Sequence, residues 1–465
     1  MSTTIIVWLR NDLRIEDNPA LSAAVKSATY VIPLFILDEK LLTASSNRTK
    51  FLLESLRDLK HSLQERGGDL AIRKGEPVGV LSKIATETNA DALYYAADYT
   101  PYSTIRDKKV DESLNRISIE TKRFPGRLIV DDIEKVKTKS DTPYKVFSPF
   151  HRSWATAKRR PLASAPSSLS LPTGFDTGKL PLASDYTKFS QLSPRVQAGG
   201  ESAAKKRLAE FLNSQVRTYH ETHNDMAADN TSRLSAYLHF GCVSPLWIES
   251  QLGDSDGEQA FARQLAWRDF YHTILYNFPT TPDEEFQERY RTLYWNKNDE
   301  HLDAWKQGKT GYPIVDAAMR QLLNEGWMHN RGRLIVGSFL TKDLQLDWRL
   351  GEEHFMKWLI DGDPANNIGN WQWIASVGVD PAPLFRRLYN PTSQAKNYDP
   401  KHEYIRRYVP ELRNVPDAYI AEPWKMSQEI QIEADCIIGE DYPAPIVDHA
   451  TAREETIARY KSAGQ

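Results

Sequence analysis

The pattern of apolar residues changes once along this chain, and that change limits its fold. Before residue 135, short apolar runs such as 4–9 and 30–37 alternate with stretches of helical period such as 51–59. Strands that alternate with helices are typical of βαβ units and a parallel sheet. After residue 201, apolar positions recur at helical spacing, as in 260–278, and strand-like runs are scarce. The chain is therefore predicted to hold an α/β domain followed by an all-α domain.

A polar segment separates the two patterns. Residues 161–193 are rich in Pro, Ser, Thr and Gly, a composition typical of a connector between domains. We therefore expect residues 1–135 to form an α/β domain with a doubly wound, Rossmann-like parallel sheet, residues 136–200 to form the interdomain linker, and residues 201–465 to form the helical domain. No G-x-G-x-x-G follows the first predicted strand, so a standard dinucleotide site is not supported there.

Composition excludes several classes of protein. The 465 residues are 40% hydrophobic and 26% charged, which is ordinary for a globular protein. No apolar run reaches about 18 residues, so no transmembrane helix is expected, and the N-terminus lacks the pattern of a signal peptide. The two cysteines, Cys242 and Cys436, offer neither a disulfide framework nor a zinc-ligand spacing. We expect a cytoplasmic protein with no membrane partner and no metal.

Two short motifs are candidate phosphate-binding sites. Residues 231–235, TSRLS, precede a predicted helix, where hydroxyls and backbone N–H groups can bind a phosphate. Simple helix capping is the alternative explanation. Further along, Asn330 and Arg333 lie within one helical turn and can clamp a phosphate or a planar base. The alternative for this pair is an ordinary solvated helix face.

Tryptophan and basic residues gather in the second half of the chain. Ten of the 12 tryptophans lie at or after Trp247, where core packing is the default role and redox chemistry the second. Between Arg386 and Arg413 there are seven basic and three acidic residues, although the net charge is -3. This stretch is the best candidate for a surface that follows a phosphate backbone, and an ordinary charged surface is the alternative. Zinc-hydrolase, nucleophile-elbow and Walker A motifs are absent.

Several motifs in order give the chain a family resemblance. It resembles the DNA photolyase and cryptochrome family over essentially its whole length, and most of all the class I cyclobutane pyrimidine dimer photolyases. The resemblance implies an α/β antenna-type domain joined to an all-α domain that binds FAD. The motifs are VWLRNDLR at 7–14, GYPIVDAAMRQL at 311–322, WMHNR at 327–331, SFLTKDL at 338–344, DGD at 361–363 and WQW at 371–373.

The resemblance also implies roles in cofactor binding. Asn367 stands where the family places the residue facing flavin N5, and an amide there is photolyase-like. A second, light-harvesting chromophore is expected to be a deazaflavin or a flavin, if there is one, because the Asn-Glu pair of folate-binding members is missing near Tyr102. The other implied FAD-binding residues are Tyr219, Thr231, Ser232, Arg233, Leu234, Ser235, Gln264, Arg268, Trp327, Asn330, Arg333, Asp361 and Asp363.

Catalysis in such a protein is electron transfer. Trp371, Trp348 and Trp295 match the family's relay of tryptophans from the flavin to the surface, and Asn367 and Gln264 complete the implied catalytic set. The residues implied for the lesion and its DNA are Trp267, Trp373, Asn330, Arg331, Leu334 and Arg386.

The resemblance implies a carbon–carbon lyase, a deoxyribodipyrimidine photo-lyase. It would use blue light and excited FADH⁻ to split cyclobutane pyrimidine dimers in UV-damaged DNA, and it is expected to be a monomer. Two positions depart from the commonest pattern: Gln264 replaces a Glu, as in (6-4) photolyases, and Leu334 replaces a Met. Asn330 after His329 favours the cyclobutane branch. The alternatives are a (6-4) or single-strand-specific photolyase and a cryptochrome-type blue-light photoreceptor, although the retained lesion-pocket residues favour repair.

Overall fold

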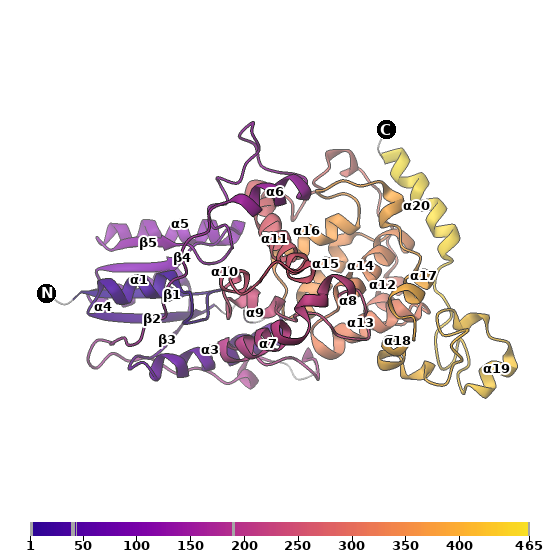
Figure 1. Ribbon diagram of the computed structural model, residues 1–465, viewed down its shortest axis with the longest axis horizontal. Coiled ribbons are helices and arrows are strands. Elements are labelled where there is room, and N and C mark those ends of the chain that lie inside the picture. The colour runs from indigo at the N-terminus through magenta and orange to yellow at the C-terminus, as the bar shows by residue number, and fades with distance from the viewer. Residues whose placement is uncertain (1–2, 39–41, 43, 188–190, 464–465) are drawn as a thin grey trace.

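A five-stranded parallel sheet occupies the N-terminal part of the chain (Figure 1). The computed structural model describes residues 3–38, 42, 44–187 and 191–463. The strand order is β3-β2-β1-β4-β5, and every neighbouring pair is parallel. Because the chain builds outward from β1 to one side and then to the other, the sheet is doubly wound, as predicted. The strands are β1 (Thr4–Leu9), β2 (Tyr30–Leu37), β3 (Ala71–Lys74), β4 (Ala92–Ala96) and β5 (Glu120–Phe124).

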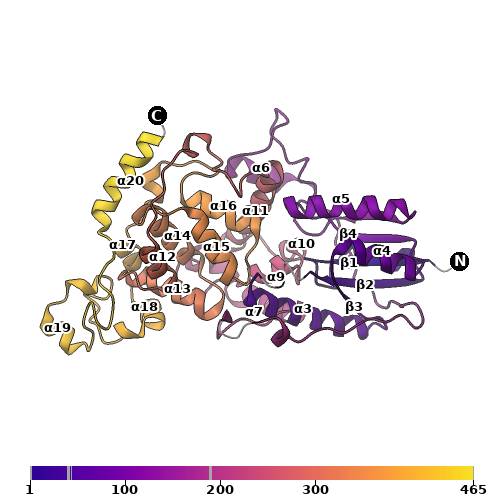
Figure 2. The ribbon, with the colours of Figure 1, turned by 180° about the vertical axis from the view of Figure 1, so that it is seen from behind.

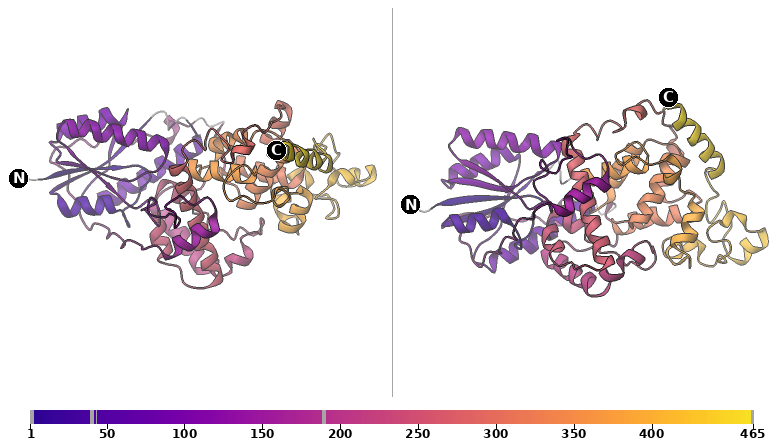
Figure 3. Two further views of the ribbon diagram at one scale, coloured as in Figure 1. Left: turned by 90° about the horizontal axis from the view of Figure 1, so that it is seen from above. Right: turned by 45° about the horizontal axis from the view of Figure 1, so that its top comes forward.

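Helices cover both faces of this sheet, as the left view of Figure 3 shows. They are α1 (Pro19–Ser27), α3 (Ser46–Gln64), α4 (Pro77–Glu87) and α5 (Pro101–Arg116). Along β1, Ile6 and Trp8 point to the face that α4 and α5 cover, whereas Ile5, Val7 and Leu9 point to the face of α1 and α3. Burial on both faces explains why the central strands β2, β1 and β4 are nearly continuous apolar runs, whereas the edge strand β5 is polar and largely exposed.

The chain after β5 is helical in the residues that the structure describes, which confirms the predicted all-α part (Figures 1 and 2). The α-helices of this part are α6 (Phe147–Thr156), α7 (Glu201–Ser214), α8 (Tyr219–Thr222), α9 (Ser235–Phe240), α10 (Pro245–Glu249), α11 (Asp256–Asn277), α12 (Asp299–Gln307), α13 (Pro313–Glu325), α14 (Asn330–Ser338), α15 (Trp348–Trp358), α16 (Pro364–Ile374), α17 (Pro391–Tyr398), α18 (Glu403–Tyr408), α19 (Gln428–Glu433) and α20 (His449–Ala463). A π-helical turn, η5 (Phe339–Asp343), continues α14. The single-turn helices are η1 (Ala183–Asp185), η3 (Val216–Thr218), η4 (Glu288–Tyr290), η6 (Leu384–Arg387), η7 (Pro410–Leu412) and η8 (Pro423–Lys425). Over the described ranges, no helix is both long and apolar enough to cross a bilayer.

The segment predicted as a linker contains α6, which packs on α11. Asp269 of α11 joins three parts of the chain. Its Oδ2 accepts hydrogen bonds from the backbone N–H groups of Ile129 (3.0 Å) and Val130 (3.1 Å) and from the indole of Trp154 on α6 (2.9 Å). One apolar core also runs from the α1–α3 face of the sheet into α7, α9 and α11. The helical part is therefore fixed against the sheet rather than tethered to it, while the predicted domain limits stay a prediction.

Candidate functional site

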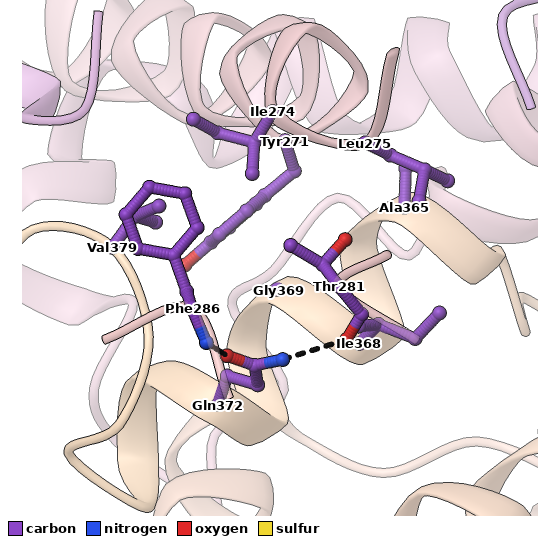
Figure 4. Close-up of a pocket in the computed structure, with 10 residues that line it drawn as sticks. All are labelled: Tyr271, Ile274, Leu275, Thr281, Phe286, Ala365, Ile368, Gly369, Gln372 and Val379. Atoms are coloured by element: carbon purple, nitrogen blue, oxygen red, sulfur yellow. Dashed lines mark hydrogen bonds between the residues drawn. The ribbon is translucent and has the colours of Figure 1, made fainter. Parts of the chain in front are cut away.

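The site is built on two helices that touch, α11 and α16. Gly369 of α16 lies against the ring of Tyr271 on α11, so closely that a Cβ at Gly369 would overlap that ring. One turn away along α11, Leu275 lies beside Ala365, which is one turn earlier on α16 (Figure 4). The contacts thus run in opposite order along the two helices, which makes them antiparallel. Trp267 on α11 and Trp373 on α16 consequently lie at the same end of the pair.

Gln372 fixes the rotation of α16. This buried side chain borders a small apolar cavity between α11 and α16 (Figure 4). Its Oε1 accepts from Phe286 N (2.8 Å), and its Nε2 donates to the carbonyls of Thr281 (2.7 Å) and Glu284 (2.8 Å). With Gln372 held in this way, the flanking tryptophans point to different sides, because helical neighbours two apart differ by about 200°. Trp371 is 3% exposed, whereas Trp373 is half-buried.

The three predicted relay tryptophans lie on segments that contact one another. Gly351, one turn after Trp348 on α15, lies against the Trp371 ring, and a Cβ there would overlap it. Residues three apart share a helix face, so Trp348 faces the helix that carries Trp371. Trp295 lies next to the segment that precedes Trp348, because Asn296 N donates to the carbonyl of Gln345 at 2.8 Å. The structure thereby brings all three indoles into one region.

Two neighbours of these tryptophans were not predicted. The Trp348 indole N–H donates to the carboxylate of Glu285 at 3.3 Å. The ring of Trp305 lies 6.1 Å from that of Trp371, centroid to centroid. Sequence spacing holds no signal for either contact, because both depend on how distant segments pack.

The predicted phosphate loop, residues 231–235, closes against α13 and α14. Arg233, in the left-handed region at φ 50°, covers the Trp327 ring at 4.1 Å and donates to Glu325 at 2.8 Å. Arg207 donates to the carbonyls of Ser232 (2.9 Å) and Thr231 (2.5 Å) and so fixes the loop from behind. The Thr231 hydroxyl is buried without a partner. Leu234 is buried and Ser235, the first residue of α9, is exposed.

Arg333 and Asp361 form the next part of the site. Arg333 Nη2 donates to Asp361 Oδ2 at 2.8 Å, while Asp361 Oδ1 is buried and unpartnered. Asp363, two residues on, caps α16 by accepting from Asn366 N at 3.0 Å. Burial opposes its ionisation, yet His239, whose Nδ1 lies 3.5 Å from Asp363 Oδ2, and the nearby His272 and Arg127 hold the pKa of Asp363 well below its usual range.

Asn367 is oriented by a second carboxylate that the sequence analysis did not identify. Its Nδ2 donates to Glu352 Oε1 at 2.9 Å and to the Glu352 carbonyl at 3.1 Å. Burial raises the pKa of Glu352. With the amide nitrogen engaged, the amide oxygen of Asn367 is the group left to face a ligand.

The remaining predicted FAD and lesion residues on α11 share one face of that helix. Trp267 is half-buried and Gln264, one turn before Arg268, is exposed. Arg268 Nη1 donates to the carbonyl of Arg127 at 2.8 Å. Phe147 of α6 stacks on Trp267, with ring centroids 3.6 Å apart. The helical spacing of Phe147, Phe150 and Trp154 is a local signal for α6 that lies within the predicted linker.

Three further predicted residues occupy the first turns of α14. Asn330 is exposed, and Leu334, one turn later, is half-buried. Arg331 Nη2 donates to Asn224 Oδ1 at 2.6 Å, and its guanidinium covers the Tyr398 ring at 4.0 Å. Tyr219 of α8 packs on His223 beside this group, with ring centroids 4.9 Å apart. Burial raises the pKa of Tyr219 to about 12.

The basic stretch from Arg386 to Arg413 is only partly a charged surface. Arg386 is exposed, as a phosphate contact requires. Arg387 is 1% exposed and its guanidinium covers the Trp373 ring at 3.9 Å, so its prediction as a surface cation is wrong. The physical reason is that a guanidinium stacks well on an indole face and here supports Trp373 from within. Lys396 and Arg406 are engaged too, with Glu422 (3.3 Å) and Asp417 (2.9 Å).

The side chains fit FAD by the polar groups they leave unpaired. Thr231 Oγ1 and Asp361 Oδ1 are buried polar atoms that find no partner among the described residues, and such atoms are costly unless a ligand or water satisfies them. The hydroxyls and N–H groups of 231–235 suit phosphates, and the amide of Asn367 suits a ring edge. Among the described residues, no group of three or more His, Cys, Asp or Glu is arranged to hold a metal ion.

Comparison with known proteins agrees with this geometry. Residues 5–167 match the family model of DNA photolyase, and residues 261–462 match that of the FAD-binding domain of DNA photolyase. A deoxyribodipyrimidine photo-lyase of Alkalihalophilus pseudofirmus is 40% identical over 98% of this chain and 97% of its own length.

Solved structures are similar over the whole chain. A bacterial class III photolyase from Agrobacterium tumefaciens has a TM-score of 0.93 at 34% identity and covers 100% of this chain and 98% of its own. A Synechocystis cryptochrome has a TM-score of 0.89 at 31% identity and covers 99% of both chains. Since repair enzyme and cryptochrome share this backbone, the fold alone does not separate them. The matched models and the full-length relatives establish that this chain belongs to the DNA photolyase family and carries its FAD-binding domain.

Proposed function

We propose that this protein repairs cyclobutane pyrimidine dimers in DNA with blue light. The observation that carries the proposal is the antiparallel packing of α11 and α16, which sets Trp267 and Trp373 at one end of the pair. Both indoles are half-buried, and each is backed by a buried partner, Phe147 or Arg387. Two partly exposed aromatic faces with rigid support can hold two linked pyrimidines that have left the duplex stack.

FAD would be held by residues 231–235, Arg333, Asp361 and Asn367, and when bound it supplies the light-excited electron donor. The chain's own residues would bind the cofactor and the lesion, orient them and stabilise the negative charge on the lesion. Gln264, exposed beside Trp267, can donate a hydrogen bond to a pyrimidine carbonyl and so stabilise negative charge on it. An amide cannot supply a proton, and splitting a cyclobutane ring requires no general acid.

DNA would be held by cations around this end of the helix pair. Arg386 is exposed, and Arg331 lies half-buried next to Asn330 at the start of α14. Because phosphate contacts position the duplex without selecting its sequence, these residues would orient the lesion rather than recognise it.

The test is light-dependent repair of an oligonucleotide with one defined lesion. Parallel samples hold a cyclobutane dimer, a (6-4) product and a dark control. Trp373→Ala should lower dimer binding and repair while flavin photoreduction is retained. Trp247→Ala, which removes another half-buried indole on α10, is the matched control. Full-rate repair by Trp373→Ala would refute the assignment of the lesion pocket.

Two other outcomes distinguish the alternatives. Repair of the (6-4) product alone would make Gln264 the decisive residue and assign the chain to that branch. Absence of repair on either lesion, with FAD bound and photoreducible, would assign the chain to the photoreceptors. The similarity to the Synechocystis cryptochrome supports that second candidate. Trp267 and Trp373, each supported by a buried side chain, favour repair.

A further inference from the structure

Helix α20, at the C-terminal end of the helical part (Figure 2), carries Arg459, which lies beside the last tryptophan of the proposed relay. The Arg459 guanidinium lies 5.1 Å from the centroid of the Trp295 ring. It donates to the carbonyls of Tyr294 (3.1 Å), Gln345 (3.2 Å) and Thr341 (3.1 Å), and its Nε is buried with no partner. Over the described part of the chain no carboxylate forms an ion pair with Arg459. Its positive charge is therefore not neutralised beside Trp295.

The charges around Trp348 have the opposite balance. The Trp348 indole donates to Glu285 Oε1 at 3.3 Å, and the Glu285 side chain is 7% exposed. Arg349 covers the Trp348 ring at 4.6 Å and pairs with both Glu285 (3.0 Å) and Asp347 (3.1 Å). Two carboxylates and one guanidinium leave a net negative charge next to Trp348.

We propose that Arg459 holds the electron hole of the relay on Trp348 by disfavouring its transfer to Trp295. An indole that has lost one electron is a cation, so a nearby cation destabilises it and a nearby anion stabilises it. In the last step of the relay, one electron leaves Trp295 and fills the hole on Trp348, and no bond breaks. Arg459 opposes that step, and the carboxylates at Trp348 oppose it too.

This device deepens the proposed function and rests on the predicted relay of Trp371, Trp348 and Trp295. A hole on Trp348 is out of reach of solutes, because that side chain is 1% exposed. A hole on half-buried Trp295 can be filled by an external reductant or lose its indole proton to water. Arg459 would thus restrict electron uptake from solution and spare Trp295 from oxidation. A unit charge at this distance shifts the equilibrium by roughly fourfold in an effective dielectric of about 80 and by roughly two-hundredfold in one of about 20.

The test uses the flavin-loaded protein and transient absorption of the tryptophan radical after a light pulse. Arg459→Gln removes the charge and keeps a donor for the carbonyls. It should increase, about tenfold or more, the rate at which an added thiol reductant removes the radical. It should also raise the amount of oxidised Trp295 found by mass spectrometry after prolonged illumination. Arg459→Lys, which keeps the charge, should behave like the parent protein.

Arg453→Gln is the matched control, because it removes one exposed positive charge from the same helix. Hydrogen exchange of residues 449–463 shows whether α20 stays docked in each variant. In a Trp295→Phe background, Arg459→Gln should have no effect on the radical.

Two results would overturn the proposal, and they are distinguishable. If Trp295→Phe changes the radical lifetime but Arg459→Gln leaves it and the thiol rate unchanged, or if Arg459→Lys acts like Arg459→Gln, the relay stands and the role of Arg459 is wrong. If Trp371→Phe leaves radical formation intact, the relay itself fails and the role of Arg459 fails with it.

Discussion

Phe147 lies flat against Trp267, with the two ring centroids 3.6 Å apart and the ring planes 5° from parallel. Phe147 belongs to α6, in the segment predicted as a linker, and it is 1% exposed. Arg263 also lies over the Phe147 ring, with its guanidinium carbon 4.7 Å from the ring centroid. Trp267, the proposed wall of the lesion pocket, is thus the outer member of a stack. Phe147 lies behind it and would not contact the ligand.

This stack makes Phe147 a positioning residue for lesion binding. Phe147→Leu keeps an apolar side chain and loses the stacked ring, so affinity for dimer-containing DNA should fall about fivefold. Flavin content should not change. Phe150→Leu, one turn away and not stacked on Trp267, serves as the control in fluorescence-anisotropy titrations. Equal affinities for the two variants would contradict the role of the stack.

Gln372 is expected to contribute more to the stability of the protein than its position between two tryptophans indicates. Gln372→Leu leaves one backbone N–H and two carbonyls of the 281–286 loop without partners, so the protein should lose about 3 kcal/mol of stability. Urea unfolding followed by tryptophan fluorescence measures this loss. Asn370→Ala, on the exposed side of the same helix, should cost about 0.5 kcal/mol or less. A Gln372→Leu variant as stable as Asn370→Ala would refute the anchoring role.

Arg386 and Arg387 should behave differently although they are adjacent. Arg386→Ala should weaken binding to damaged and undamaged DNA alike and lower the salt dependence by about one ion. Arg387→Ala removes the support under Trp373, so it should reduce the preference for damaged DNA about fivefold and leave the salt dependence unchanged. Titrations at several salt concentrations measure both quantities. The reverse pattern would mean that Arg387, not Arg386, faces the phosphates.

Asp361 should control retention of FAD. Asp361→Asn removes the negative charge that pairs with Arg333 and replaces one carboxylate oxygen by an amide nitrogen, so FAD should dissociate about tenfold more readily. Flavin absorbance per protein after dialysis gives the measurement. Asp417→Asn breaks an exposed pair with Arg406 and should leave flavin content unchanged. Full flavin retention by Asp361→Asn would exclude Asp361 from the cofactor site.

Because of His354, the stability of the folded protein should fall in mild acid. Burial lowers the pKa of His354 to about 3, and Lys306 and Lys357 act in the same direction. An unfolded histidine takes a proton near pH 6.5, so below about that pH the unfolded state binds one more proton and stability falls as the pH falls. Between about pH 6.5 and pH 5 this costs about 2 kcal/mol. His354→Phe should lose that share of the slope in urea unfolding, and parallel pH profiles would contradict the assignment.

Local pattern was sufficient for the kinds of element and for the motifs that carry the family resemblance. Alternating apolar runs predicted β1, β2 and β4, because burial on both faces of a parallel sheet demands continuous apolar strands. Helical spacing predicted α11, and ordered motifs pointed to the FAD-binding domain that the comparison then showed. The roles given to single residues, such as Asn367 and Trp295, remain predictions that the experiments above test.

The sequence by itself determined the two kinds of architecture and the family, because periodicity and motifs are local properties of a chain. Only the tertiary structure decided which of two adjacent arginines is buried, that Phe147 backs Trp267, and that Arg459 stands beside Trp295. These pairings join residues far apart in the chain. They follow from how helices pack, and neither helical period nor composition records which distant side chain that packing brings into contact.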